Sequence, residues 1–107
     1  MSGIHNLASA TLIAATLLFE IVPSAAADAG NGSRLARRWC APCHVVAQDQ
    51  QAPTGEAPPF ATIASQPNFD AARVALFLLD PHPKMPDMGL SRAAASDLAA
   101  YIGTLKK

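Results

Sequence analysis

The sequence has 107 residues, eight basic and eight acidic side chains, and a formal net charge of zero at pH 7. This balance argues against a nucleic-acid-binding protein, which usually presents a strongly basic surface. The length suits one small domain whose core needs additional support. A disulfide between the two cysteines, at positions 40 and 43, would close too small a loop to supply that support.

An unbroken apolar run spans residues 7–19 and is followed by an Ala-x-Ala pattern that ends at Ala27. The run is shorter than the roughly 20 residues that a spanning helix needs, and it suits a secretory signal peptide. We therefore expect residues 1–27 to be a signal peptide, cleaved before Asp28, and residues 28–107 to form one exported domain. The expected location is the periplasm, with no stable membrane insertion after cleavage. The first six residues lack lysine and arginine, so an uncleaved membrane anchor is the alternative.

The first helix is predicted over residues 31–42, where small and apolar residues recur every three or four positions. Asn31 or Ser33 is its expected N-cap. The helix runs directly into the cysteine pair. The loop that follows is rich in proline and glycine, which excludes regular structure apart from a turn near residues 60–65.

A second helix is predicted over residues 68–79, with Asn68 as N-cap and with Val74, Phe77 and Leu78 on one stripe. Prolines at positions 81, 83 and 86 exclude a helix from the next segment. The final helix is predicted from Ser91 to about residue 105. The sequence therefore predicts an all-α domain with three main helices and two long loops.

Cys40, Cys43 and His44 form a C-x-x-C-H motif. Cysteines three positions apart on a helical turn point the same way, so both thiols can add to vinyl groups at one edge of a porphyrin. The next residue is then carried beneath the ring, where its imidazole can bind the iron. We therefore expect a covalently attached haem c, with thioether bonds at Cys40 and Cys43 and with His44 as an iron ligand.

An electron-carrying haem of this kind needs a second axial ligand, and the segment PHPKMPDMG offers three. We expect Met85 to be the ligand, because a thioether favours ferrous iron and the flanking prolines restrict its conformational freedom. Met88 and His82 are the competing candidates, and ligation by His82 would lower the reduction potential.

With these motifs, the sequence resembles the small bacterial type of class I monohaem cytochrome c over nearly all of residues 30–107. Gly32 and Ala36 stand eight and four positions before Cys40, like the first-helix contact residues of that family. Leu98 and Tyr101 match the pair on the last helix that crosses them. The resemblance implies a cytochrome c fold with three main helices around one haem. It also assigns Met85, in the segment MPDMGLS, to the ligand position.

The same resemblance extends to the segment APPF at residues 57–60. It implies that the carbonyl oxygen of Pro58 or Pro59 accepts a hydrogen bond from the second ring nitrogen of His44. Two departures from the family are the small Ala36, where an aromatic residue is frequent, and Val45, where a glycine is frequent.

Two other interpretations of the motif remain. The string WCAPC matches the active site of thioredoxin-like thiol-disulfide oxidoreductases, but the preceding residues are helical and no βαβ pattern follows. A five-coordinate gas-binding protein or haem enzyme would need an open iron site, which Met85 is expected to close. We therefore expect no enzyme activity.

The resulting hypothesis is a monomeric one-electron carrier that docks transiently with redox partner proteins such as a dehydrogenase or an oxidase. A haem c subunit held permanently by such a partner is the alternative. Arg34, Arg37 and Arg38 could guide an acidic partner, although a solvated helix face explains them more simply. Apolar side chains are expected to cover the haem, so the chain without haem should be largely unfolded. Those side chains are Phe60, Leu76, Phe77 and Leu98.

Overall fold

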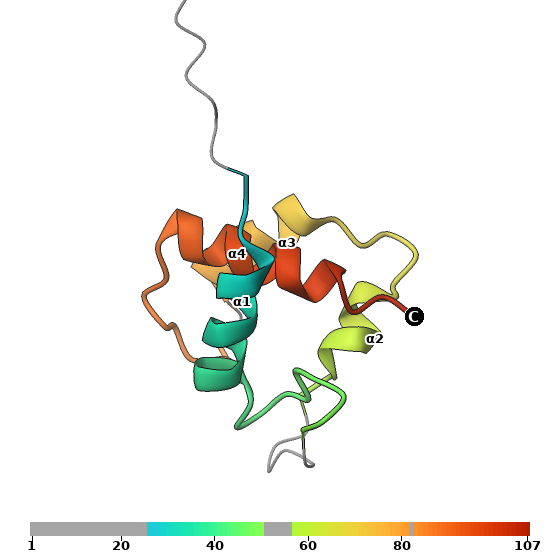
Figure 1. Ribbon diagram of the computed structural model, residues 1–107. Coiled ribbons are helices and arrows are strands. Elements are labelled where there is room, and N and C mark those ends of the chain that lie inside the picture. Colours follow the sequence, from blue (N-terminus) through green and yellow to red (C-terminus); the bar gives the residue numbers. More distant parts are fainter. Residues whose placement is uncertain (1–25, 51–56, 82) are drawn as a thin grey trace, which may run out of the picture.

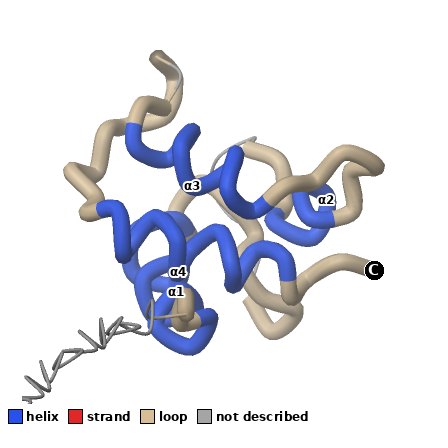
Figure 2. The backbone as a smooth tube through the Cα atoms, turned by 90° about the horizontal axis from the view of Figure 1, so that it is seen from above, coloured by secondary structure: helices blue, strands red, loops and turns tan. Residues whose placement is uncertain are grey.

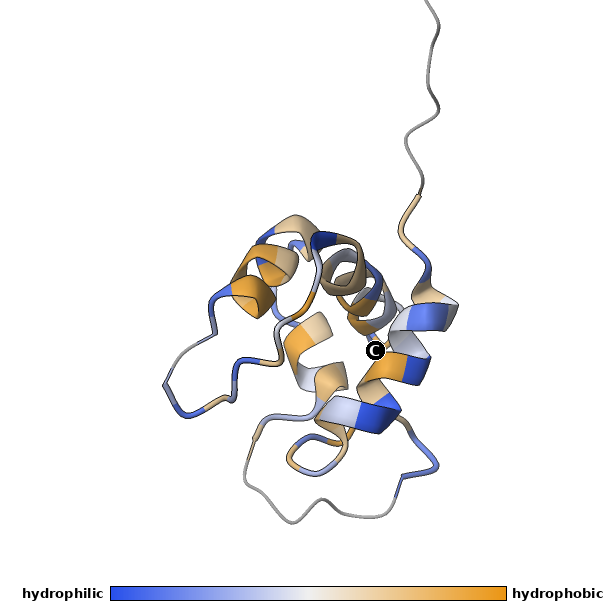
Figure 3. Ribbon diagram, turned by 90° about the vertical axis from the view of Figure 1, so that its left-hand side faces the viewer, coloured by the Kyte–Doolittle hydropathy of each residue, from blue (hydrophilic) through white to orange (hydrophobic). Residues whose placement is uncertain are grey.

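A computed structural model of the protein describes residues 26–50, 57–81 and 83–107. Within these ranges every regular element is a helix and there is no strand (Figures 1 and 2), as predicted. The helices carry most of the hydrophobic residues, whereas the connecting loops are more hydrophilic (Figure 3). None of the described helices has the length and apolar composition needed to cross a membrane. The apolar run over residues 7–19 lies outside the described residues, so the signal peptide stays a prediction.

The first helix consists of α1, Ala29–Leu35, and a π-helical continuation, η1, Ala36–Cys40. Its N-cap is Asp28, whose carboxylate accepts a hydrogen bond of 2.9 Å from the N–H of Asn31. The prediction of Asn31 or Ser33 as the cap was therefore wrong. A tertiary contact accounts for the earlier start, because the N–H of Asp28 is itself bonded to Asp97 Oδ1 at 2.7 Å.

The remaining helices are α2, Phe60–Ala64, α3, Ala71–Leu79, and α4, Arg92–Gly103. Helix α3 begins later than predicted, because the Asp70 carboxylate, not the Asn68 side chain, accepts hydrogen bonds from the first-turn N–H groups of Ala72 and Arg73. The prediction for α4 is confirmed at its start, where the Ser91 hydroxyl accepts a hydrogen bond of 3.0 Å from the N–H of Ala94.

Helix α1 packs closely against helix α4, although the two lie at opposite ends of the domain sequence (Figure 1). The approach depends on Gly32, which is buried. A Cβ atom at this position would collide with the backbone carbonyl of Asp97 and would lie 2.8 Å from Cβ of Tyr101. Leu98 and Ala36 are buried in the same core. The expected crossing of the first and last helices is therefore present.

Helix α3 covers the core with one face only. Leu78 is buried, and Val74 packs against the buried cluster. Leu76 is 68% exposed and does not line the cavity described below, so the structure does not support its expected role in covering the haem. At helical periodicity Leu76 lies on the side opposite Val74 and Leu78. Phe77 is 44% exposed but lines the cavity described below.

Candidate functional site

The C-x-x-C-H segment forms a tight turn at the end of η1. The carbonyl oxygen of Cys40 accepts hydrogen bonds from the N–H groups of Cys43, at 3.1 Å, and of His44, at 2.9 Å. This turn brings all three side chains to one cavity. Cys40 is buried, Cys43 is exposed, and the two form no disulfide. The spacing thus places both sulfur atoms and the imidazole at the same site.

The pKa of the Cys40 thiol is shifted in the opposite direction to that of an activated thioredoxin-type nucleophile. Burial, and secondarily the neighbouring Cys43, raise its pKa to about 11. A reactive dithiol needs a lowered pKa, supplied by a helix N-terminus or a nearby cation. Cys40 instead ends a helix. The structure therefore gives no support to a thiol-disulfide oxidoreductase.

The cavity has a volume of about 760 Å³, within the range of about 300–1,000 Å³ that is typical of ligand sites. It takes residues from η1, from the turn after it, from the segment before α2, from α2 itself, from α3 and from the loop before α4. The lining residues are Trp39, Cys40, Pro42, Cys43, His44, Ala57, Pro58, Ile63, Phe77, Lys84, Met85, Pro86 and Met88.

His44 is held by two contacts from the segment that leads into α2. Its Nδ1 lies 2.6 Å from the carbonyl oxygen of Pro58. A carbonyl only accepts, so this bond places the proton on Nδ1 and leaves Nε2 with the lone pair that binds a metal. The ring centroid also lies 5.1 Å from that of Phe60, at an interplanar angle of 50°. Of the two prolines that the resemblance offered, Pro58 provides the carbonyl.

Both candidate methionines line the cavity and are half-buried. Met85 packs against the buried core cluster, and Met88 is absent from that packing. The third candidate, His82, lies outside the described residues. Past Met88 the chain turns at Gly89, which has a positive φ of 62° and donates its N–H to Asp87 Oδ1 at 2.9 Å. This turn leads into the Ser91 cap of α4.

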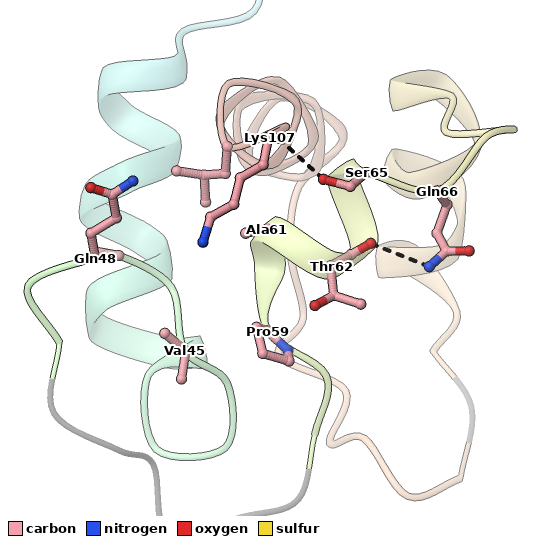
Figure 4. Close-up of a pocket in the computed structure, with 10 residues that line it drawn as sticks. Val45, Gln48, Pro59, Ala61, Thr62, Ser65, Gln66 and Lys107 are labelled. Carbon is pink, nitrogen blue, oxygen red and sulfur yellow. Dashed lines mark hydrogen bonds between the residues drawn. The ribbon is translucent and has the colours of Figure 1, made fainter.

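These residues fit a covalently bound haem. Two thiols three positions apart, an imidazole with Nδ1 already engaged, and a thioether all border one predominantly apolar cavity. This is the donor set of a c-type haem with a His and a Met ligand. A second cavity of about 490 Å³ lies between residues 45–48, α2 and the C-terminal segment (Figure 4). It contains no Cys, His or Met, so the chemistry of the motif belongs to the first cavity.

The three arginines near the motif differ in their contacts. Arg37 pairs with Asp49 at 3.3 Å, and Arg34 donates to Asn31 Oδ1 at 3.3 Å. The Arg38 guanidinium lies over the Trp39 ring, 4.9 Å from its centroid. Because Trp39 lines the cavity, only the Arg38 contact involves a residue of the cavity wall.

One residue of the site was missed by sequence reasoning. The Gln50 side chain forms three hydrogen bonds to the backbone of the C-x-x-C-H loop and of the residues next to it. A glutamine in an irregular loop has no periodicity or spacing that would indicate such a role.

Comparison with known proteins shows a clear similarity to a bacterial cytochrome. The chain is 57% identical over 81 residues to cytochrome c-552 of Bradyrhizobium diazoefficiens, a match that covers 76% of this chain and 78% of the relative. No family model matches the chain, and no solved structure matches it significantly. A relative this similar implies a covalently bound haem c, and the two cysteines at the cavity are consistent with it. The chain belongs to the family of small bacterial class I c-type cytochromes.

Proposed function

We propose that the protein is a periplasmic one-electron carrier. In this proposal Cys40 and Cys43 hold the haem through thioether bonds, and His44 and Met85 are the axial ligands of the iron. The observation that carries the proposal is the placement of all four side chains on one cavity, with Nδ1 of His44 already bonded to Pro58. The relative named cytochrome c-552 supports the same role.

The haem supplies an iron that changes its oxidation state by one electron, and the side chains around the cavity set the conditions for that change. The Pro58 carbonyl fixes the His44 ring and increases the basicity of Nε2. The Met85 thioether is a soft donor that favours ferrous iron and raises the reduction potential. Buried Phe60 packs beside the His44 ring and helps to exclude water from the site.

If His44 and Met85 both bind the iron, no position would be left for a substrate, so we propose no enzyme activity. Electrons would instead pass to redox partner proteins, such as a dehydrogenase or an oxidase, in weak and transient complexes. The exposed Cys43 side chain and the half-exposed Trp39 border the cavity, so a partner can approach it closely there. A monomer is the expected state of the free carrier.

Export is part of the proposal, and it is supported by the signal-like pattern of residues 1–27. Cleavage between Ala27 and Asp28 would leave the N-cap of α1 intact, since Asp28 is the first residue that the helix needs. N-terminal sequencing of the protein recovered from the periplasm tests this part, and a chain that keeps residues 1–27 would contradict it.

The ligand assignment is tested by absorption spectroscopy of the protein produced in cells equipped for haem attachment. The ferric wild-type protein should show the far-red charge-transfer band of a Met–iron bond. Met85→Ala should lose this band, whereas Met88→Ala, a matched change on the same cavity, should retain it. The opposite pattern would assign Met88, and retention of the band in both variants would contradict methionine ligation by this loop.

A further inference from the structure

The side-chain amide of Gln50 forms three hydrogen bonds with the backbone of residues 41–46, which we call the haem-attachment loop. Its Oε1 accepts a hydrogen bond of 2.7 Å from the N–H of Val46. Its Nε2 donates to the carbonyl oxygens of His44, at 2.7 Å, and of Ala41, at 3.0 Å. Both amide hydrogens and one lone pair are therefore engaged.

The three bonded backbone groups belong to a residue before His44, to His44 itself and to a residue after it. Ala41 lies before Cys43, and Val46 lies two residues after His44. A backbone hydrogen bond from Gln50 to Ala47, at 3.2 Å, brings the glutamine back towards the loop. The Gln50 side chain thus fixes the backbone of a loop that contains no regular helix or strand.

The loop held by Gln50 must be placed accurately against a second segment. The N–H of Phe60 bonds to the carbonyl of Val45 at 3.0 Å, and Nδ1 of His44 bonds to the carbonyl of Pro58 at 2.6 Å. Both bonds depend on the path of residues 44–46. A shift of that path would lengthen the bond to Pro58, because the His44 ring moves with its own backbone.

We propose that Gln50 is a positioning residue for the iron ligand His44, and that it acts by fixing the loop backbone and so the hydrogen bond between His44 and Pro58. The inference rests on the proposed ligation by His44. It predicts that Gln50 affects the reduction potential of the iron without contacting the iron. A weaker bond at Nδ1 makes the imidazole a weaker donor, which favours ferrous iron over ferric iron.

The test compares Gln50→Leu with wild type as holoprotein produced in cells equipped for haem attachment. Leucine is similar in size and removes all three hydrogen bonds without adding a charge or a possible iron ligand. NMR of the reduced protein measures solvent exchange of the His44 Nδ1–H, which should become at least tenfold faster. The reduction potential should rise, with at least a threefold change in the equilibrium constant, or about 28 mV at 59 mV per tenfold for one electron.

Gln48→Leu is the matched control. Gln48 is exposed, lies two residues before Gln50 and borders the second cavity (Figure 4), so neither the exchange rate nor the potential should change. If Gln50→Leu does not yield folded holoprotein, Gln50→Asn takes its place. Asparagine is one methylene too short to reach all three groups, and the same two shifts are expected.

Wild-type exchange and potential in the folded Gln50 variant would overturn the positioning role. A His44→Ala variant with the same haem spectrum as the wild-type protein would instead overturn the proposed ligation. The two failures are therefore distinguishable.

Discussion

The Tyr101 hydroxyl donates a hydrogen bond of 2.5 Å to the backbone carbonyl of Val46, and both residues are buried. The bond joins helix α4 directly to the segment that follows His44. Val46 is thereby held on both of its backbone groups, by Tyr101 at the carbonyl and by Gln50 at the N–H. The last helix and the haem-attachment loop are parts of one hydrogen-bonded unit.

Removing the hydroxyl should destabilise the protein. Tyr101→Phe leaves the aromatic packing in place but deprives a buried carbonyl of this partner, which costs about 1–3 kcal/mol. Denaturant unfolding of the holoprotein, followed by circular dichroism, measures the difference. Ser65→Ala is the control, because Ser65 accepts an exposed bond from the N–H of Lys107, and its effect should stay within about 0.5 kcal/mol. Equal effects of the two substitutions would contradict the importance of the buried bond.

A side chain at position 32 should force α1 away from α4. In Gly32→Ala the new methyl would collide with backbone of α4, which cannot move as a side chain can. We expect a loss of more than about 2 kcal/mol, at the upper end of the cost of overpacking. Gly30→Ala, in the same helix, meets only the end of the Asp28 side chain at 3.2 Å and should be nearly neutral. Thermal unfolding of both holoproteins checks this, and an unchanged Gly32→Ala would contradict the close packing.

Stability should decline in acid partly through Asp97. The N–H of Asp28, then the Asn31 amide, and the charge of Arg34 lower the pKa of the Asp97 carboxyl below its usual value of 3.8. A carboxyl with a lowered pKa in the folded state stabilises that state above its unfolded pKa, and this contribution disappears as the pH falls through the folded value.

Asp97→Asn should therefore be less stable than wild type near neutral pH, and the difference should shrink below pH of about 4. Unfolding of both proteins as a function of pH measures it. Because Asp97 is partly exposed, the effect should also diminish in high salt. A difference that is constant from neutral to acid pH would contradict the role of its charge.

The protein without haem should lose most of its helical structure. A cavity of about 760 Å³ is large for so small a domain, and without haem the side chains that line it would not be covered on that side. Far-ultraviolet circular dichroism of the double variant Cys40→Ser, Cys43→Ser, which cannot form thioethers, should show much weaker helical signal than the holoprotein. A haem-free protein with full helical signal and cooperative unfolding would contradict this expectation.

The three main helices and the grouping of Cys40, Cys43 and His44 followed from the sequence, whereas the short helix α2, expected only as a turn, and several helix starts did not. Periodicity indicated α3 and α4, and the predicted start of the last helix at Ser91 agrees with the observed cap. Asp28 and Asp70 were missed, since each lies near other residues of equal capping propensity. At Asp28 a bond to Asp97, distant in sequence, decides the start, and no local pattern carries that information.

The same limit applies inside the site. The spacing of Cys40, Cys43 and His44 predicted that they share one cavity, because a turn of helix makes their geometry local. The choice of Pro58 over Pro59 depends on how two separate loops meet, and only the three-dimensional arrangement gives it. The contribution of Gln50 was not predictable for the same reason.

The contact between α1 and α4 also constrains how the chain can be assembled. Since α1 and α4 pack on each other, this part of the core cannot form before helix α4 has been synthesised. Until that contact forms, the helix that leads into the cysteine pair lacks the partner against which it packs in the folded domain.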